Sequence, residues 1–185
     1  TRDTIDTRFK ANGREYVVID TAGLRKRGKI YENVEKYSVI RSVDAIGRSD
    51  VVLLVLDAST GMIDQDMHVG QYIEEYNKPC IIVVNKWDLI EKNSKTMQEW
   101  TDDIRSNFKY LSHAPIVFLS AKENKRVHTL FPSIIEAYEA YHRRIQTSTL
   151  NDVIADAVAM FPPSEFNGGK IRIYYTSQVG VEPPT

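Results

Sequence analysis

Residues 80–88 read CIIVVNKWD, an apolar run of five residues followed at once by four residues that include three polar ones. A continuous apolar run without polar alternation is typical of a parallel strand that is covered on both faces. Three similar runs occupy residues 16–19, 51–56 and 116–119. Between the runs, apolar residues recur at helical spacing. This alternation predicts an α/β fold with a doubly wound, mostly parallel sheet.

A hairpin is expected near the start of the chain. The dipeptide Asn12-Gly13 favours a tight turn, because both residues tolerate positive φ angles. It lies between the apolar run at residues 16–19 and a segment around Phe9. We therefore expect the Phe9 segment to be a further strand, paired with residues 16–19.

The pattern changes near Gln146, and we predict one domain over residues 1–146 and the start of a second over residues 147–185. Thr149, with an aspartate three residues later, has the spacing of a helix cap, and Pro162-Pro163 would end that helix. Residues 171–181 then alternate between apolar and polar, which predicts a strand with one wet face. One helix and one strand are too few to bury a core of their own, so this α+β piece is expected to be incomplete.

Composition limits the classes of function. The 185 residues carry a net charge of −1, which favours neither a nucleic acid nor a membrane as partner. The only cysteine, Cys80, lies in an apolar run and is expected to be buried and unreactive. A single cysteine excludes an internal disulfide and fits a cytoplasmic location. No apolar stretch approaches the length of a membrane span, so no membrane partner is expected.

Asn85, Lys86 and Asp88 follow the apolar run at residues 80–84 in an Asn-Lys-x-Asp pattern. A carboxylate at Asp88 can accept hydrogen bonds from N1–H and the 2-amino group of guanine, and adenine has neither donor on that edge. Asn85 can bond the purine edge and tie neighbouring loops together, and the stem of Lys86 can lie over the base. The alternative is a strand that simply ends in polar turn residues.

Asp20-Thr21-Ala22-Gly23 follows the run at residues 16–19 in the same way. An aspartate at a strand end can hold a water of Mg²⁺, and Gly23 lets its backbone N–H approach a γ-phosphate. The alternative is a helix-capping aspartate. Thr1, which precedes this strand, could be a second Mg²⁺ ligand.

Ser120-Ala121-Lys122 follows the run at residues 116–119, where the backbone N–H of Ala121 can meet guanine O6. The tripeptide is weak evidence by itself. The three motifs nevertheless occur in a fixed order, each directly after a predicted buried strand. Ligands of open α/β sheets bind outside the carboxyl ends of the strands, so the order points to a guanine-nucleotide site.

At this point the sequence resembles a GTPase of the translation-factor class and, more narrowly, the Der (EngA) family. That family has two GTPase domains in tandem, followed by a KH-like domain. Residues 1–3, 20–29, 35–38 and 85–88 resemble its second GTPase domain, and residues 150–152 and the segment reaching Pro183-Pro184 resemble the start of its KH-like domain. The resemblance implies a bacterial, cytoplasmic enzyme that hydrolyses GTP and helps to assemble the large ribosomal subunit.

The resemblance also implies a set of ligands and contacts. GTP or GDP would be bound with Mg²⁺, and the metal would be held by Thr1 and Asp20. The residues expected at the nucleotide are Asp20, Thr21, Ala22, Gly23, Leu24, Asn85, Lys86, Trp87, Asp88, Ser120, Ala121 and Lys122.

Leu24 stands where a Ras-like protein has its water-orienting glutamine. Because leucine cannot orient water, the resemblance implies another catalytic route with potassium as a stimulant, and no residue is assigned as catalytic. The run of basic residues at 25–29 is either a solvated loop or a patch for ribosomal RNA or for another domain of the parent chain.

One element of the family pattern is missing, because these 185 residues contain no Gly-x-x-x-x-Gly-Lys-Ser/Thr loop. We therefore expect them to be part of a longer chain. Without the strand that precedes such a loop, residues 51–56 would expose an apolar edge. Two alternatives to a GTP-hydrolysing switch remain: a nucleotide sensor that does not hydrolyse GTP, and a ribosome- or RNA-docking module carried by residues 146–185.

Overall fold

The computed structural model describes residues 5–20, 42–165, 168–169 and 171–185, with the backbone but not the side chains of Ile5 and Asp20. Contacts divide the chain into two compact units, Thr1–Tyr138 and Glu139–Thr185. The predicted domain boundary after residue 146 stays a prediction.

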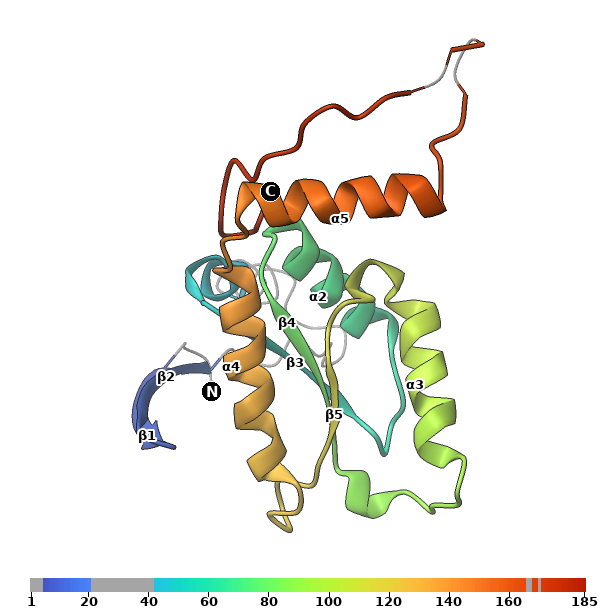
Figure 1. Cartoon of the computed structure of the whole chain (residues 1–185). Helices are drawn as coiled ribbons and strands as arrows, with labels where there is room; N and C mark the ends of the chain where they lie inside the picture. Colours follow the sequence, from blue (N-terminus) through green and yellow to red (C-terminus); the bar gives the residue numbers. More distant parts are fainter. Residues whose placement is uncertain (1–4, 21–41, 166–167, 170) are drawn as a thin grey trace, which may run out of the picture. The chain divides into compact units, whose positions relative to one another are not determined.

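Figure 1 shows how the strands and helices follow one another along the chain. A helix over residues 42–48 precedes β3. The labelled elements are β1 (Ile5–Ala11), β2 (Arg14–Asp20), β3 (Val52–Asp57), α2 (Asp64–Glu75), β4 (Cys80–Asn85), η1 (Trp87–Leu89), α3 (Thr96–Asn107), η2 (Lys109–Leu111), β5 (Ile116–Phe118), η3 (Val127–Thr129), α4 (Leu130–Tyr141) and α5 (Thr147–Met160).

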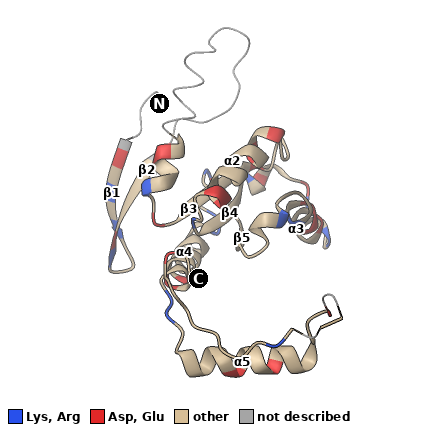
Figure 2. Cartoon of the chain, turned by 90° about the horizontal axis from the view of Figure 1, so that it is seen from above, with Lys and Arg blue, Asp and Glu red and all other residues tan. Residues whose placement is uncertain are grey.

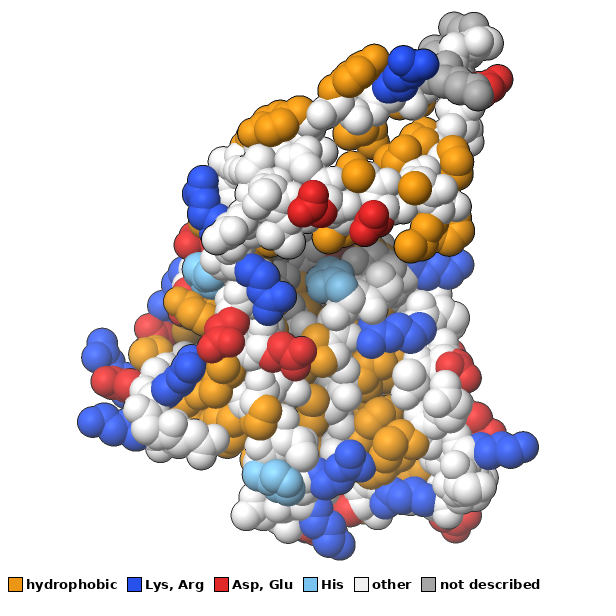
Figure 3. All heavy atoms as spheres, in the orientation of Figure 1, with side chains coloured by type: hydrophobic (Ala, Val, Ile, Leu, Met, Phe, Trp, Pro, Cys, Tyr) orange, Lys and Arg blue, Asp and Glu red, His pale blue; other side chains and the backbone are white. Residues whose placement is uncertain are grey.

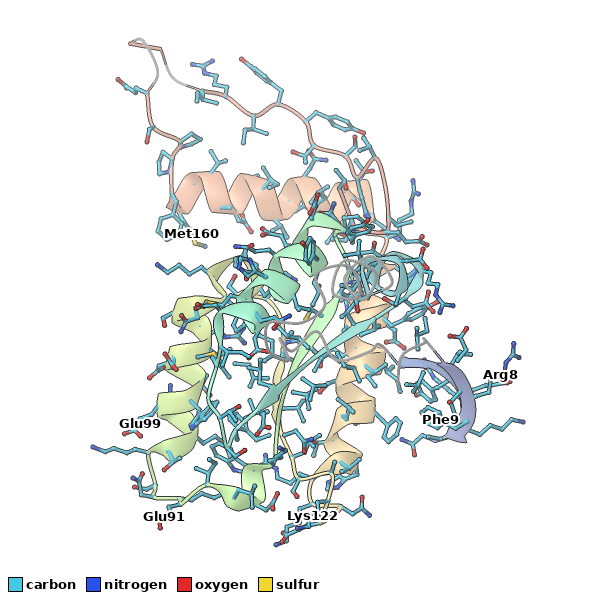
Figure 4. All side chains as sticks on the ribbon, turned by 180° about the vertical axis from the view of Figure 1, so that it is seen from behind. Arg8, Phe9, Glu91, Glu99, Lys122 and Met160 are labelled. Carbon is cyan, nitrogen blue, oxygen red and sulfur yellow. The ribbon has the colours of Figure 1, made fainter. Side chains whose placement is uncertain are left out.

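The expected hairpin is confirmed. β1 and β2 pair in antiparallel fashion with Phe9 opposite Tyr16, and the turn residues Asn12 and Gly13 have φ angles of 51° and 76°. Two positive φ angles are what a two-residue hairpin turn requires. The rings of Phe9 and Tyr16 stack with centroids 5.3 Å apart, and both contact Phe131 of α4. Figure 4 shows Phe9 turned inward.

The expectation that residues 16–19 form a parallel strand covered on both faces is wrong. β2 pairs only with β1 among the described strands, and that pairing is antiparallel. Val17 and Val18 are about half exposed as a result. The apolar run was continuous, but a run of this kind does not specify its partner strand.

A parallel sheet forms the centre of the first unit, as predicted. Its strand order is β3-β4-β5, with Leu56 beside Val84 and Val84 beside Phe118. The three strands lie side by side in Figure 1. Cys80 begins the middle strand, is 1% exposed, and has its thiol pKa raised to about 12 by burial. The predicted buried thiol is confirmed.

Helices cover both faces of this sheet. On one face, Ile73 of α2 and Ile104 of α3 are fully buried against strand residues such as Leu56. On the other face, Leu130 and Ile134 of α4 pack against a smaller cluster that alternate strand residues form. Figure 2 shows α4 on one side of the strands and α2 and α3 on the other. The predicted doubly wound α/β fold is therefore observed.

The free edge of β3 carries exposed apolar side chains. Val55 is 54% exposed and Leu53 is 37% exposed, whereas Leu54 and Leu56 on the opposite face are buried. β3 pairs with β4 on one side, and the described residues place no strand on its other side. The predicted exposed apolar edge is confirmed.

In the second unit, α5 begins three residues earlier than the sequence pattern indicated, at Thr147. Gln146 occupies the extended N-cap position, and no side chain caps the helix. Thr149 therefore lies inside α5, and its predicted capping role is wrong. The helix ends at Met160, just before Pro162-Pro163, as expected from the loss of helical geometry before proline.

No regular strand forms over the described part of residues 171–181, so the strand expected there is also wrong. A strand needs a neighbour for its backbone groups, and the described residues supply none for this segment. The side chain of Asn151 instead satisfies the backbone groups of one residue of this segment. Its amide donates to the Thr176 carbonyl over 2.7 Å, and its oxygen accepts the Thr176 N–H over 2.8 Å.

Candidate functional site

Polar residues gather at the edge where the three parallel strands end. Asp57 ends β3, Asn85 ends β4, and Ser120 follows β5. Asp57 and Asn85 are directly paired in the strand register, and the Ala58 N–H donates to the Asn85 carbonyl over 2.9 Å. The sheet itself therefore brings together side chains that are far apart in the sequence.

One side-chain oxygen of Asn85 joins two loops of this edge. Asn85 Oδ1 accepts the Lys86 N–H over 2.7 Å and the Ala121 N–H over 3.1 Å. The first bond stabilises Lys86 in a left-handed conformation, with φ of 59° and ψ of 30°. The second ties the loop after β5 to the loop after β4, which is the linking role that the sequence indicated for Asn85.

The Lys86 ammonium makes a short ion pair with a carboxylate that the sequence reasoning missed. Lys86 Nζ lies 2.6 Å from Asp57 Oδ2. The Asp57 side chain is only 8% exposed, and its other oxygen accepts hydrogen bonds from the Ser59 N–H and hydroxyl. Burial raises the pKa of Asp57, but the bonds from Lys86 and Ser59 outweigh it and hold that pKa well below its usual range.

Asp88 lies in η1, the short helix that directly follows Lys86. Its Oδ1 is buried and has no hydrogen-bond partner among the described residues. The Ser120 hydroxyl beside the carboxyl is the main cause that lowers the pKa of Asp88, with smaller contributions from Lys122 and Lys92. The Asp88 carboxylate is therefore an ionised acceptor, and such a group favours a ligand with N–H donors.

Trp87 occupies a different place from its two neighbours. Its side chain is buried in the core, with ring centroids 4.6 Å from Phe118 and 5.9 Å from Trp100. The structure thus places Trp87 beneath the loop as a packing residue and leaves Lys86 and Asp88 on the outer side.

A short loop with basic side chains closes the edge next to Asp88. Ser120 and Lys125 exchange two backbone hydrogen bonds of 3.0 Å, so the residues between them form a compact turn. Lys122 is exposed at the end of the sheet (Figure 4). Figure 3 shows Lys and Arg side chains gathered at this end of the first unit. The exposed basic residues of the loop are Lys122, Lys125 and Arg126.

The structure brings together five of the predicted site residues at the ends of β4 and β5, with Lys122 on the loop beyond: Asn85, Lys86, Asp88, Ser120 and Ala121. Trp87, also predicted at the nucleotide, packs in the core instead. The other predicted nucleotide contacts, Thr21, Ala22, Gly23 and Leu24, lie outside the described residues. So do the basic run at residues 25–29 and the segment at 35–38.

The predicted Mg²⁺ ligands are not described either. Thr1 lies outside the described residues, and only the backbone of Asp20 is described, at the end of β2. Within the described part of the chain, no group of three or more His, Cys, Asp and Glu side chains could hold a metal ion.

Family profiles match both ends of the chain. Residues 1–86 match the profile of the 50S ribosome-binding GTPases, and residues 144–185 match the KH-domain-like, C-terminal profile of EngA bacterial GTPase enzymes. GTPase Der from Macrococcus caseolyticus (strain JCSC5402) is 55% identical over all 185 residues. GTPase Der from Staphylococcus epidermidis (strain ATCC 12228 / FDA PCI 1200) is 53% identical over the same length.

Over its whole length the chain is similar to GTPases of the Der (EngA) family. It spans 42% of the length of each of these relatives. The resemblance that the motifs indicated is thus confirmed over the whole of the chain.

Solved structures of GTPases share the fold. The crystal structure of Era in complex with MgGDPNP and nucleotides 1506–1542 of 16S ribosomal RNA has a TM-score of 0.64 and 25% identity, covering 74% of this chain and 45% of that one. A single-residue variant of Era from Aquifex aeolicus, bound to GDP.AlF4⁻, has the same TM-score, 26% identity and the same coverage. Both likenesses place the chain in the α/β GTPase fold.

Membrane-spanning helices are not found in the part of the chain that the structure describes. None of the helices there is both long enough and apolar enough to cross a lipid bilayer.

Proposed function

We propose that this chain supplies the guanine-reading part of a switch protein that binds and hydrolyses GTP during assembly of the large ribosomal subunit. The observation that carries the proposal is the position of the Asp88 carboxylate, just beyond the end of β4 and beside Ser120 and Lys122 of the next loop. A guanine base offers this carboxylate two parallel N–H donors. Hydrogen bonds from these donors to an ionised carboxylate are charge-assisted, and adenine offers neither donor on that edge.

The neighbouring residues fit the same role. The Lys86 stem provides methylene groups for the face of a base. The Ala121 N–H already donates to Asn85 over 3.1 Å and can share its hydrogen with guanine O6 in a three-centre bond. The exposed amine of Lys122 complements the negative charge of a nucleotide, while that of Lys125 is paired with Glu123 over 2.6 Å.

GTP hydrolysis, Mg²⁺ and stimulation by potassium belong to the whole protein, and we propose them from the family. The relatives are named GTPase Der, and Mg²⁺ would be held by Thr1 and Asp20. Held there, the metal would supply positive charge against the phosphates.

Ribosomal RNA is proposed as the macromolecular partner. Support comes from the match to 50S ribosome-binding GTPases, from the KH-domain-like match, and from the ribosomal RNA in the Era complex. The same proposal places the protein in the bacterial cytoplasm, where ribosomes assemble. A docking module without hydrolysis is the second candidate, favoured by the KH-domain-like match at residues 144–185.

Asp88→Asn tests the guanine-reading role in the protein that the complete reading frame encodes. Asparagine offers the base edge an amide N–H donor, so it mismatches N1–H of guanine and matches the carbonyl of xanthine. We expect the affinity ratio of GDP to xanthosine diphosphate to fall by about 10²-fold or more in competition titrations. Asp102→Asn, an exposed change on α3 outside the site, serves as the control. An unchanged ratio in Asp88→Asn would remove Asp88 from the site.

A further inference from the structure

Asp57 is a buried charged residue at the carboxyl end of β3, and it is not part of the Asn-Lys-x-Asp motif. It ends β3, one strand away from the motif, and its side chain is 8% exposed. A buried carboxylate is costly unless it is paired and hydrogen-bonded. Its partners therefore indicate what the residue does.

The two oxygens of Asp57 have different partners. Oδ1 accepts the Ser59 N–H over 3.0 Å and the Ser59 hydroxyl over 2.6 Å, which stabilises the turn that follows β3. Oδ2 accepts from the Lys86 ammonium over 2.6 Å. The first pair of bonds is local and concerns the turn, while the second reaches across to the neighbouring loop.

Lys86 is consequently held at both ends of its side chain. At the backbone, Asn85 Oδ1 accepts its N–H and supports the left-handed conformation. At the tip, Asp57 binds its Nζ. A free lysine side chain samples many rotamers and loses that freedom when it orders against a ligand. A lysine that is held at both its backbone and its ammonium group has already lost most of this rotamer freedom. Such preorganisation increases the affinity for a ligand.

We propose that Asp57 is a positioning residue for nucleotide binding. It would act by holding the Lys86 stem at the carboxyl ends of the strands, where the proposed function places the base. The inference rests on the proposed function, because it takes guanine nucleotide as the ligand. Asp57 does not touch the base, so it affects affinity for the nucleotide and leaves the choice between guanine and xanthine to Asp88.

The test is a double-mutant cycle of Asp57→Asn and Lys86→Met in the protein from the complete reading frame, read as the dissociation constant of fluorescent GDP. Each single variant is expected to bind GDP about tenfold more weakly than the wild type. If Asp57 acts through Lys86, adding Asp57→Asn to Lys86→Met causes no further loss. Asp57→Asn is expected to keep the wild-type ratio of GDP to xanthosine diphosphate.

Ser59→Ala is the matched control, because it removes a bond to Oδ1 and leaves the Oδ2–Lys86 pair in place. It is expected to lower the melting temperature without changing GDP affinity measured well below that temperature. If Asp57→Asn does not fold, Asp57→Glu replaces it in the cycle. Glutamate keeps the charge but shifts it by one methylene, so it should weaken binding beside Lys86 and have no effect beside Met.

Three results would overturn the inference. An Asp57→Asn protein that binds GDP as tightly as the wild type would leave Asp57 with a structural role in the turn alone. Losses of the two single variants that multiply in the double variant would show that Asp57 acts independently of Lys86. A wild-type protein that does not bind GDP would overturn the proposed function, and this inference with it.

Discussion

At the scale of single residues, the candidate site is organised by two oxygen-bearing side chains at strand ends. Asn85 could be found from the sequence, because it opens a four-residue motif directly after a buried strand. Asp57 could not be found in this way, because its partner Lys86 lies 29 residues away. Only the pairing of β3 with β4 brings Asp57 and Lys86 together. The one signal for Asp57 in the sequence was its position, as an acidic residue at the end of a predicted buried strand.

The lowered pKa of Asp57 also predicts how the stability of the fold depends on pH. Its pKa in the folded protein is depressed below the usual aspartate value, so its contribution to stability is complete above that usual value and is lost as the pH falls below it. From about pH 5 to about pH 3, the free energy of unfolding should fall more steeply in the wild type than in Asp57→Asn, by up to about 1.4 kcal/mol per pH unit. Urea titrations at several pH values measure this difference. Equal slopes would contradict the assignment.

At the scale of elements, buried strands could be predicted from the sequence and pairing partners could not. β3, β4 and β5 appear where continuous apolar runs lie. Helices cover both faces of β4 and β5, whereas one face of β3 is partly exposed. The run at residues 16–19 looks the same in sequence, yet β2 pairs with β1 in a separate hairpin. The alternating residues 171–181 form no strand, because an alternating pattern does not provide a neighbouring strand to pair with.

α2 provides a test of packing at the same scale. A Cβ at Gly70 would lie 2.9 Å from Phe108 Cε1 and 2.9 Å from the Tyr110 hydroxyl, which itself donates to the Met67 carbonyl over 2.9 Å. Gly70→Ala gains about 1 kcal/mol of helix propensity but overpacks the core, at a cost of typically about 1–3 kcal/mol.

We expect Gly70→Ala to be destabilised by about 1 kcal/mol in denaturant titration, because the cost of overpacking exceeds the gain in propensity. Gly180→Ala is the control, since a Cβ at Gly180 meets no atom within 4 Å and its φ is not left-handed. A Gly70→Ala protein that is more stable than the wild type would mean that Phe108 and Tyr110 move aside without strain.

At the scale of the whole molecule, the 185 residues include the side chains proposed to bind the base and contain no phosphate-binding motif. Because that loop cradles the phosphates of a nucleotide, we expect the 185-residue chain alone to bind GTP weakly and not to turn it over. Calorimetry and a phosphate-release assay measure the two properties. A nanomolar dissociation constant for GTP would contradict this account.

The same chain tests the docking alternative. If residues 146–185 carry binding to the ribosome, removal of residues 1–145 should leave that binding in place, as a co-sedimentation assay would measure. Loss of binding would favour a role that needs the GTPase part as well.

The buried thiol of Cys80 can serve as a chemical probe of how often the parallel sheet opens. Cys80 is the only sulfhydryl, it begins the middle strand of the sheet, and burial keeps it protonated. Only a thiolate that solvent can reach reacts quickly with an alkylating reagent. Alkylation of native protein would therefore proceed only through molecules whose central strand has separated from its neighbours, and its rate would report how often the sheet comes apart.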